Sequence, residues 1–215
     1  MPTTQTSRKR STTTRGTKGG RRPSRAPRQD AVAILKDDHR AVEELFKKFE
    51  RAGDGAAKQK RKLVDQMLVE LSQHASIEEQ VLYPWAREYI EDEDEQVLEA
   101  IEEHHVVKWL LSELEDLDPK DERFDAKVTV MMESVRHHVK EEESKLFPDL
   151  RDVATRAELL DLGDALQQAR KHAPSRPHPR GADTPPVNVV AAPIASALDH
   201  AREVGRDVVE RVGGS

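Results

Sequence analysis

One phrase of eleven residues occurs twice in the chain. HASIEEQVLYP runs from His74 to Pro84, and HVKEEESKLFP runs from His138 to Pro148. Both copies contain His, three residues, Glu-Glu, two residues, Leu, an aromatic residue and Pro, in that order. Two copies of one phrase predict two copies of one structural unit. They restrict the fold to arrangements in which two equivalent segments can face each other.

Both copies lie in a region of helical periodicity. From Asp30 to about His172, the inward positions recur every three or four residues, which is the period of one face of an α-helix. Each of four stretches carries a single stripe of this kind. The stripes are Val32, Leu35, His39, Val42, Phe46 and Phe49; Leu63, Met67, Leu71, His74, Glu78, Val81 and Trp85; Val97, Ile101, His104, Val107, Leu111 and Leu114; and Val128, Met131, Val135, His138, Glu142 and Leu146.

Short breaks separate the four stretches. They are GDG at 53–55, EDEDE at 91–95 and DLDPKDE at 116–122. Short connections favour antiparallel neighbours, so we expect an all-α fold in which an up-down four-helix bundle occupies residues 30–172. Pro84 and Pro148 should kink or end their helices at the same relative point. A shorter fifth helix is expected near residues 155–171.

The two ends of the chain differ from this body. Residues 1–29 form a basic arm rich in Ser, Thr, Gly and Arg, which we expect to be disordered because it lacks large apolar side chains. The arm is either a solubilising segment or a contact for nucleic acid or another polyanion. Residues 173–215 combine a flexible Pro-rich linker with an amphipathic helix. This helix would dock on its own bundle or pair with a copy of itself in a homodimer; its apolar face is Ile194, Leu198, Ala201, Val204, Val208 and Val212.

The composition excludes several classes of protein. The chain has no cysteine, which excludes disulfides, thiol catalysis and Cys-ligated zinc or iron–sulfur sites, and which is compatible with the cytoplasmic location that we expect. No apolar run approaches the ~20 residues of a membrane span, so no membrane association is expected. Aromatic residues make up only 4% and charged residues 35%, which favours a helical domain over a sandwich or barrel.

Six inward positions carry polar side chains, where an apolar core would have residues such as Leu or Val. They are His39, His74, Glu78, His104, His138 and Glu142. A buried carboxylate without a partner costs several kcal/mol, more than a lost leucine contact. Two carboxylates and four imidazoles in one small core therefore need a compensating charge, which a pair of divalent metal ions would supply.

The spacing supports a metal pair. His and Glu four residues apart lie one turn apart on the same helix face, as His74 and Glu78 do, and as His138 and Glu142 do. DDHRAVEELF at 37–46 parallels EEHHVVKWLL at 102–111 and aligns the two remaining histidines. The chain is thus two helical hairpins, each with one His and then His-x-x-x-Glu. Each ion would receive two imidazoles, and the two carboxylates would bridge the ions.

Four neighbouring residues have less certain roles. Glu79 and Glu143 are duplicated along with the ligands, so they are either groups that orient the imidazoles or exposed charges. His105 follows His104 but faces about 100° away, so it is either an alternative ligand or a surface residue. Tyr83 either donates a hydrogen bond to an oxygen species on the metal or packs at the bundle end.

Residues 30–150 resemble the hemerythrin-like, HHE cation-binding domains, and the doubled HxxxEExxL[YF]P carries the resemblance. The family implies a four-helix bundle around a non-haem di-iron centre. Its ligand pattern falls on His39, His74, Glu78, His104, His138 and Glu142. Imidazole and carboxylate ligands in this number also suit two iron ions better than manganese or zinc.

The chain departs from oxygen-carrying hemerythrins at two points. Their fifth histidine corresponds to Lys108, four residues after His104, and their last carboxylate corresponds in spacing to Glu143 rather than Glu142. The chain is more similar to bacterial and regulatory members linked to iron, O2, NO or peroxide. We therefore expect a di-iron protein that reacts with or senses such a ligand, with decomposition of hydrogen peroxide in oxidative stress as the enzymatic form. The alternative is a non-catalytic, metal-dependent sensor or interaction protein.

Overall fold

The structure, a computed structural model, describes residues 28–53, 55–91 and 93–181, and these are helical without strands. The helices are α1 (Ala31–Glu50), α2 (Ala57–Ile77), α3 (Tyr83–Tyr89), α4 (Asp94–Asp116), α5 (Phe124–Glu141), α6 (Phe147–Val153) and α7 (Arg156–Arg170). Two π-helical segments, η1 (Glu78–Leu82) and η2 (Glu142–Leu146), join α2 to α3 and α5 to α6.

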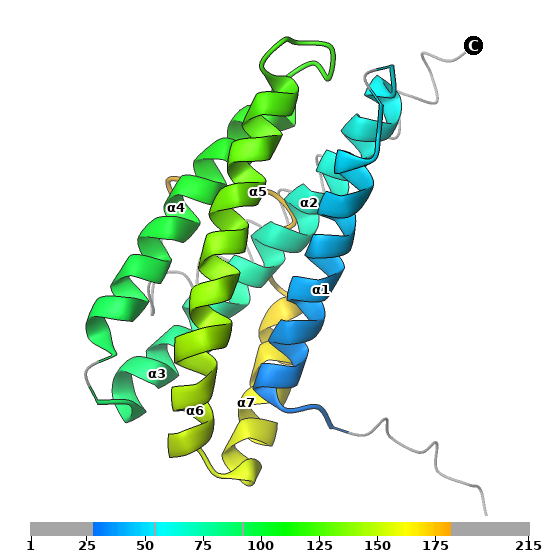
Figure 1. Cartoon of the computed structure of the whole chain (residues 1–215). Coiled ribbons are helices and arrows are strands. Elements are labelled where there is room, and N and C mark those ends of the chain that lie inside the picture. The colour runs from blue at the N-terminus through cyan, green and yellow to red at the C-terminus, as the bar shows by residue number, and fades with distance from the viewer. Residues whose placement is uncertain (1–27, 54, 92, 182–215) are drawn as a thin grey trace, which may run out of the picture.

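Four long helices form the bundle. In Figure 1, α1, α2, α4 and α5 run alongside one another, and α7 lies beside the lower end of α1. The packing follows the chain, with α1 against α2, α2 against α4, and α4 against α5. This arrangement confirms the expected all-α bundle. The fifth helix, α7, packs on α1, α2 and η1.

Local sequence explains where two of these helices begin. The Asp30 side chain accepts a hydrogen bond from the Ala33 N–H at 2.8 Å and caps α1. Thr155 caps α7 in a reciprocal arrangement with Glu158, whose carboxylate accepts from the Thr155 N–H at 2.7 Å. Caps of this kind satisfy N–H groups that the first helical turn leaves unpaired.

The two prolines lie just after the π-helical segments. Proline has no N–H to give to the preceding turn, so a regular α-helix cannot accommodate it in its interior. Here each helix widens by one residue before the proline: the N–H groups of Tyr83 and Phe147 donate to the carbonyls of Glu78 and Glu142, five residues back. Each π-helical segment begins at the inward Glu. In both repeats, the irregular turn therefore starts at a candidate metal ligand.

A polar layer divides the core in two. One apolar cluster lies at the end of the bundle that α3, α6 and α7 cover, and the other extends toward the α1–α2 and α4–α5 loops. Along each long helix, the inward histidine stands between residues of the two clusters. Large buried members are Leu35, Ile77, Leu82 and Phe147 in the first cluster, and Phe46, Met67, Leu111 and Phe124 in the second.

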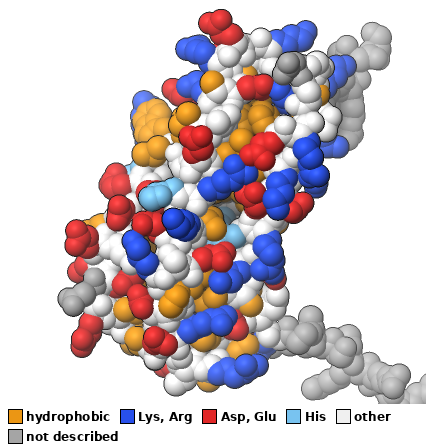
Figure 2. Space-filling view, viewed as in Figure 1, with side chains coloured by type: hydrophobic (Ala, Val, Ile, Leu, Met, Phe, Trp, Pro, Cys, Tyr) orange, Lys and Arg blue, Asp and Glu red, His pale blue; other side chains and the backbone are white. Residues whose placement is uncertain are grey.

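The surface mixes both signs of charge. Lys and Arg side chains alternate with Asp and Glu over the face shown in Figure 2. No helix in the part of the chain that the structure describes is long and apolar enough to cross a membrane. Residues 1–27 of the expected basic arm and the expected C-terminal helix lie outside the described residues, so the division of the chain into arm, bundle and tail stays a prediction.

Gly163 allows α7 to approach the start of α1 closely. A Cβ atom at Gly163 would lie 2.3 Å from the backbone oxygen of Gln29 and 3.1 Å from the backbone nitrogen of Ala31. Both contacts are to backbone atoms, which cannot move aside as the end of a side chain can. A larger residue here would therefore push α7 away from α1.

The first prediction concerns this contact. Gly163→Ala should destabilise the protein by about 1–3 kcal/mol, the usual cost of overpacking, and lower the melting temperature by several degrees. The matched control is Gly53→Ala, because no atom lies within 4 Å of that Cβ position. Thermal unfolding followed by circular dichroism measures both. Equal melting temperatures for the two variants would contradict the close approach.

Candidate metal centre

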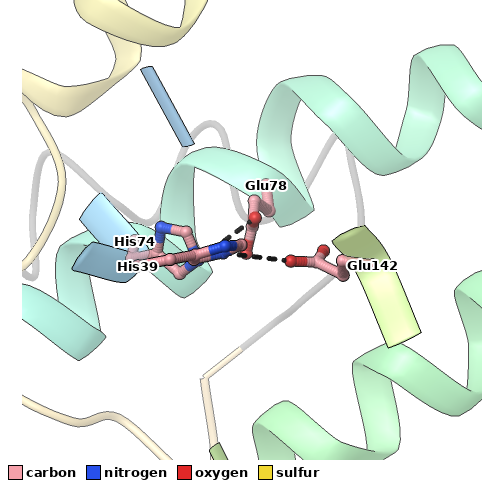
Figure 3. Close-up of side chains that lie close together, drawn as sticks. All are labelled: His39, His74, Glu78 and Glu142. Carbon is pink, nitrogen blue, oxygen red and sulfur yellow. Dashed lines mark hydrogen bonds and ion pairs between the residues drawn. The ribbon is translucent and has the colours of Figure 1, made fainter. Parts of the chain in front are cut away.

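The six inward histidine and glutamate side chains meet in one layer across the bundle. His39 comes from α1, His74 from α2, His104 from α4 and His138 from α5, while Glu78 and Glu142 begin η1 and η2. Each of the six has an exposed fraction of 6% or less. Figure 3 shows part of the layer, where the side chains of His39, His74, Glu78 and Glu142 point toward one another.

The imidazoles form two close pairs through their Nε2 atoms. His39 Nε2 lies 3.2 Å from His74 Nε2, and His104 Nε2 lies 3.1 Å from His138 Nε2. An ion that holds each nitrogen at about 2.1 Å separates two adjacent ligands by about 3 Å. The spacing within each pair is therefore that of two neighbouring ligands of one metal ion.

On its other ring nitrogen, each imidazole meets a carboxylate. The Nδ1–H groups donate from His39 to Glu143 at 2.9 Å, from His74 to Asp38 at 3.2 Å, from His104 to Glu79 at 2.9 Å and from His138 to Glu103 at 2.8 Å. A neutral ring that donates from Nδ1 keeps a lone pair on Nε2. Two lone pairs therefore face each other in each pair, and this arrangement is typical of histidines that bind metal.

Each of these four carboxylates has a basic neighbour of its own. Arg170 from α7 binds Asp38, with one N–H donating at 2.9 Å. Lys108 binds both oxygens of Glu79, at 2.6 and 2.7 Å. Glu143 lies 3.2 Å from the Lys36 ammonium, and Glu103 lies 3.4 Å from His137 Nε2. This series of contacts, from imidazole to carboxylate to basic side chain, holds each ring in a fixed orientation.

The two inward carboxylates connect the imidazole pairs. The contacts to Nε2 atoms are Glu78 Oε1 to His74 at 3.2 Å, Glu78 Oε2 to His104 at 3.5 Å, Glu142 Oε2 to His39 at 3.3 Å and Glu142 Oε2 to His138 at 3.6 Å. Each carboxylate thus lies against one imidazole of each pair. This is the position that a carboxylate bridging two metal ions would occupy.

Hydrogen bonding leaves these carboxylates unsatisfied. Both oxygens of Glu78 and Oε2 of Glu142 are buried without a hydrogen-bond partner. Buried polar atoms in folded proteins are nearly always paired, and an unpaired carboxylate is costly. Two facing pairs of imidazole lone pairs and three unpaired carboxylate oxygens are a donor set that fits two cations.

Ionisation equilibria lead to the same conclusion. Burial and the neighbouring Glu142 carboxylate raise the pKa of Glu78 well above its usual value. Burial also opposes the ionisation of Glu142, but His138 and His39 outweigh it and lower the pKa of Glu142 to about 2. Burial lowers the pKa values of His74 and His104, whereas at His138 the Glu142 and Glu103 carboxylates outweigh burial and raise the pKa. The two inward carboxylates therefore resist being ionised together, and the neutral imidazole that metal ligation requires is favoured at His74 and His104.

Tyr83 and Phe147 occupy equivalent positions in the two repeats but behave differently. The Tyr83 hydroxyl is buried, donates to Glu142 Oε1 at 3.0 Å and lies 3.3 Å from His104 Nε2. The Phe147 ring instead stacks on the His39 ring, with centroids 5.7 Å apart. Burial, together with the Glu142 and Glu78 carboxylates, raises the pKa of Tyr83 well above its usual value, so its hydroxyl keeps its proton at neutral pH.

The structure places the other sequence candidates as follows. Glu79 and Glu143 lie beside the imidazoles, in the orienting positions considered for them. Tyr83 belongs to the layer rather than only to the bundle end. His105 lies outside the layer: its Nδ1 is 3.4 Å from Glu102 on the same helix. Lys108 does not replace a histidine ligand, because its ammonium binds Glu79. That the six inward residues ligate a metal stays a prediction.

Three residues that contact the site were not predicted from the sequence. Asp38 and Glu103 directly precede His39 and His104, and the parallel segments DDHRAVEELF and EEHHVVKWLL contain both carboxylates at the same place. This duplication was a signal that could have found them. Arg170 had no such signal, because it reaches Asp38 from α7, 132 residues away in sequence.

Comparisons with known proteins agree with the geometry. The family model of the hemerythrin HHE cation binding domain matches residues 30–150. A hemerythrin-like protein of Schizosaccharomyces pombe is 28% identical over 173 residues, which are 80% of this chain and 84% of that protein. A crystal structure of a hemerythrin HHE cation binding domain-containing protein from Mycobacterium kansasii superposes with a TM-score of 0.56 and 26% identity, covering 66% of this chain and 88% of that one.

A second curated relative is larger. A DNA nickase of Nostoc sp. is 31% identical over 119 residues, which are 55% of this chain. The match spans only 33% of the nickase, so two thirds of that protein have no counterpart in the aligned region.

The second prediction tests the role of the outer carboxylates. Asp38→Asn keeps the shape of the side chain but removes the charge beside His74 and Arg170, so the affinity for Fe(II) should fall about 10–100-fold. Asp37→Asn is the matched control, because Asp37 is exposed and pairs with Arg40 and Gln29 instead. Anaerobic competition with a chromophoric chelator measures both affinities. If the two variants bind Fe(II) equally well, Asp38 does not support the site.

Proposed function

The chain belongs to the hemerythrin HHE cation-binding domain family, and from that premise we propose that its His/Glu layer holds two iron ions that react with O2, hydrogen peroxide or NO. One observation carries the proposal. Two pairs of Nε2 lone pairs converge on three carboxylate oxygens that have no hydrogen-bond partner. This donor set needs positive charge, and the family model describes a cation-binding domain.

The geometry suggests how the ligands are shared. His39 and His74 would hold one ion, and His104 and His138 the other, with the two inward carboxylates between them. The close groupings of possible ligand atoms support this, since one contains His39, His74, Glu78 and Glu142 and another contains Glu78, His104 and His138. Glu78 belongs to both groupings, as expected of a bridging carboxylate.

Iron fits this ligand set better than the common alternatives. Imidazole nitrogen and carboxylate oxygen suit iron, manganese and zinc, but a zinc site usually has four ligands to one ion and no need for shared carboxylates. Six protein ligands shared by two ions leave positions free for a small molecule. When bound, the iron pair supplies electron transfer to and from that molecule.

The protein side chains supply the surroundings for this chemistry. The outer carboxylates keep the four imidazoles in one tautomer and orientation. Apolar clusters lie on both sides of the layer, and each of the six inward side chains is at most 6% exposed. Tyr83 holds a proton at its hydroxyl, next to Glu142 and His104, where it can be donated to an oxygen atom of a bound ligand. Decomposition of hydrogen peroxide to oxygen and water is the enzymatic form of the proposal, in which two peroxide molecules give one O2 and two water molecules.

A non-catalytic, metal-dependent sensor or interaction protein is the second candidate. The DNA nickase relative and the nine Lys and Arg residues among residues 1–30 favour contact with nucleic acid in this case. Net negative charge on the rest of the chain opposes such contact. Two results together would favour the sensor over the enzyme. The metal-bound protein would show no peroxide turnover, and it would bind DNA with a salt-sensitive affinity that disappears when residues 1–28 are removed.

The third prediction tests the metal centre itself. Native protein should contain about two iron ions per chain and show near-ultraviolet or visible charge-transfer absorption that changes on adding peroxide. His104→Ala should lose at least half of the metal and most of the absorption, because it removes one ligand of the proposed centre. His105→Ala, the neighbouring control, should keep both. A folded, colourless and metal-free native protein would overturn the proposal.

The fourth prediction concerns the proton at Tyr83. Tyr83→Phe reproduces the residue that the other repeat has at Phe147, so metal content should be unchanged. Peroxide decomposition should slow at least tenfold if the hydroxyl donates a proton in the reaction, in line with the usual contribution of about 10²–10⁴-fold from acid–base groups. Oxygen evolution measures the rate. An unchanged rate at full metal content would limit Tyr83 to a packing role.

A further inference from the structure

A large cavity connects the histidine layer with the surface. Its volume is about 650 Å³, and residues of α1, α2, α4, α5 and η2 line it. The four inward histidines are all in its wall, whereas Glu78, Glu142 and Tyr83 are not. The cavity therefore approaches the layer from the side of the second apolar cluster. Figure 2 shows histidine side chains in the hollow between α5 and α1.

The inner walls of the cavity are apolar. Aliphatic and aromatic side chains from all four long helices form them: Val42, Phe46, Leu71, Val107, Leu111, Val135 and Val139. Most of these are core residues with little exposure. An apolar ligand would therefore find apolar contacts from all four long helices.

Charged residues surround the mouth. Arg136 on α5 donates to Glu43 at 3.0 and 3.1 Å and lies 2.8 Å from Glu50, both on α1. Its guanidinium also stands over the Phe46 ring, 5.5 Å from the centroid. These contacts join α1 and α5 across the cavity. Charged side chains therefore connect the two helices above the apolar lining.

The volume exceeds what a diatomic ligand or peroxide requires. One water molecule occupies about 30 Å³ of liquid, and binding pockets for larger organic ligands measure about 300–1,000 Å³. A passage for O2 would not need walls of this extent. The cavity has the size and lining expected for an organic ligand with a substantial apolar part.

We propose that this cavity binds a single-chain amphiphile, with its alkyl chain among Val107, Val135 and Val139 and its oxygen-containing head at the histidine layer. The head is a carboxylate or a hydroperoxide, because both are oxygen ligands that a metal pair would accept. The placement of the head rests on the proposed function, and the placement of the chain rests on the cavity alone. A fatty acid, or the hydroperoxide derived from one, is thus the class of organic ligand for the centre.

The fifth prediction concerns the binding of alkyl carboxylates of different length to the native, full-length protein, measured by calorimetry. The probes are hexanoate, octanoate, decanoate and dodecanoate, and iron content is determined on the same samples. The affinity should rise about threefold to fourfold for each added methylene until the cavity is filled. Dodecanoate should also change the optical absorption of the metal centre.

Two valine-to-tryptophan variants on α5 locate the binding site. Val135 lines the cavity, so Val135→Trp should fill it and weaken dodecanoate binding at least tenfold. Val130 is 50% exposed and outside the lining, so Val130→Trp should bind as the unmodified protein does. Circular dichroism shows whether each variant is folded. The chain-length series needs no variant, so it tests the cavity even if Val135→Trp does not fold.

Four outcomes would overturn the inference. Two of them are the absence of binding and an affinity that does not depend on chain length. The others are equal binding by the two variants, and binding that appears only after residues 182–215 are removed, which would assign the cavity to that segment. An unchanged metal spectrum would overturn the placement of the head. If the protein contains iron and turns over peroxide but binds no alkyl carboxylate, this inference is wrong and the proposed function stands. If iron-free native protein binds the alkyl carboxylates, only the proposed function and the placement of the head are wrong.

Discussion

The hydrogen bonds from the four imidazoles to the four carboxylates are the interaction on which the rest of the structure depends. Each bond joins two different helical elements: His39 of α1 to Glu143 of η2, His74 of α2 to Asp38 of α1, His104 of α4 to Glu79 of η1, and His138 of α5 to Glu103 of α4. Because η1 extends α2 and η2 extends α5, these bonds form a closed ring around the bundle. The same bonds orient the rings for metal binding, so one set of contacts both joins the helices at the layer and sets the geometry of the site.

This ring explains how the bundle tolerates an open side. Between α1 and α5 the cavity replaces part of the apolar packing that a continuous core would provide. Two polar links cross this side, one from Glu143 to His39 inside and one from Arg136 to Glu43 and Glu50 at the surface. The apolar clusters at either end hold the helices together above and below the layer. A wide interior space next to the metal centre is therefore compatible with a stable bundle.

Sequence alone predicted the helices and the six inward polar residues, because both depend on local spacing. The stripes fix which side of each helix faces inward, and the doubled phrase relates the two hairpins. Arg170 and the cavity depend instead on how helices distant in sequence approach one another. The π-helical turns were also missed, because Glu78 and Glu142 fit a regular α-helical period, and only the prolines that follow them indicated an irregularity. Asp38 and Glu103 were within reach of the sequence, since they repeat with the histidines.

The two halves of the site share their inward residues and differ in the residues around them. Where one repeat has Tyr83, whose hydroxyl reaches Glu142, the other has Phe147, which stacks on His39. Four residues after the first histidine of each hairpin, one half has Lys108, which binds Glu79, and the other has Glu43, which binds Arg136 at the mouth of the cavity. These differences put the Tyr83 hydroxyl in one half and the contacts of Arg136 at the cavity mouth in the other. Two metal positions with equivalent imidazole ligands would thus have unequal surroundings, so a ligand entering past Arg136 would meet the centre opposite Tyr83.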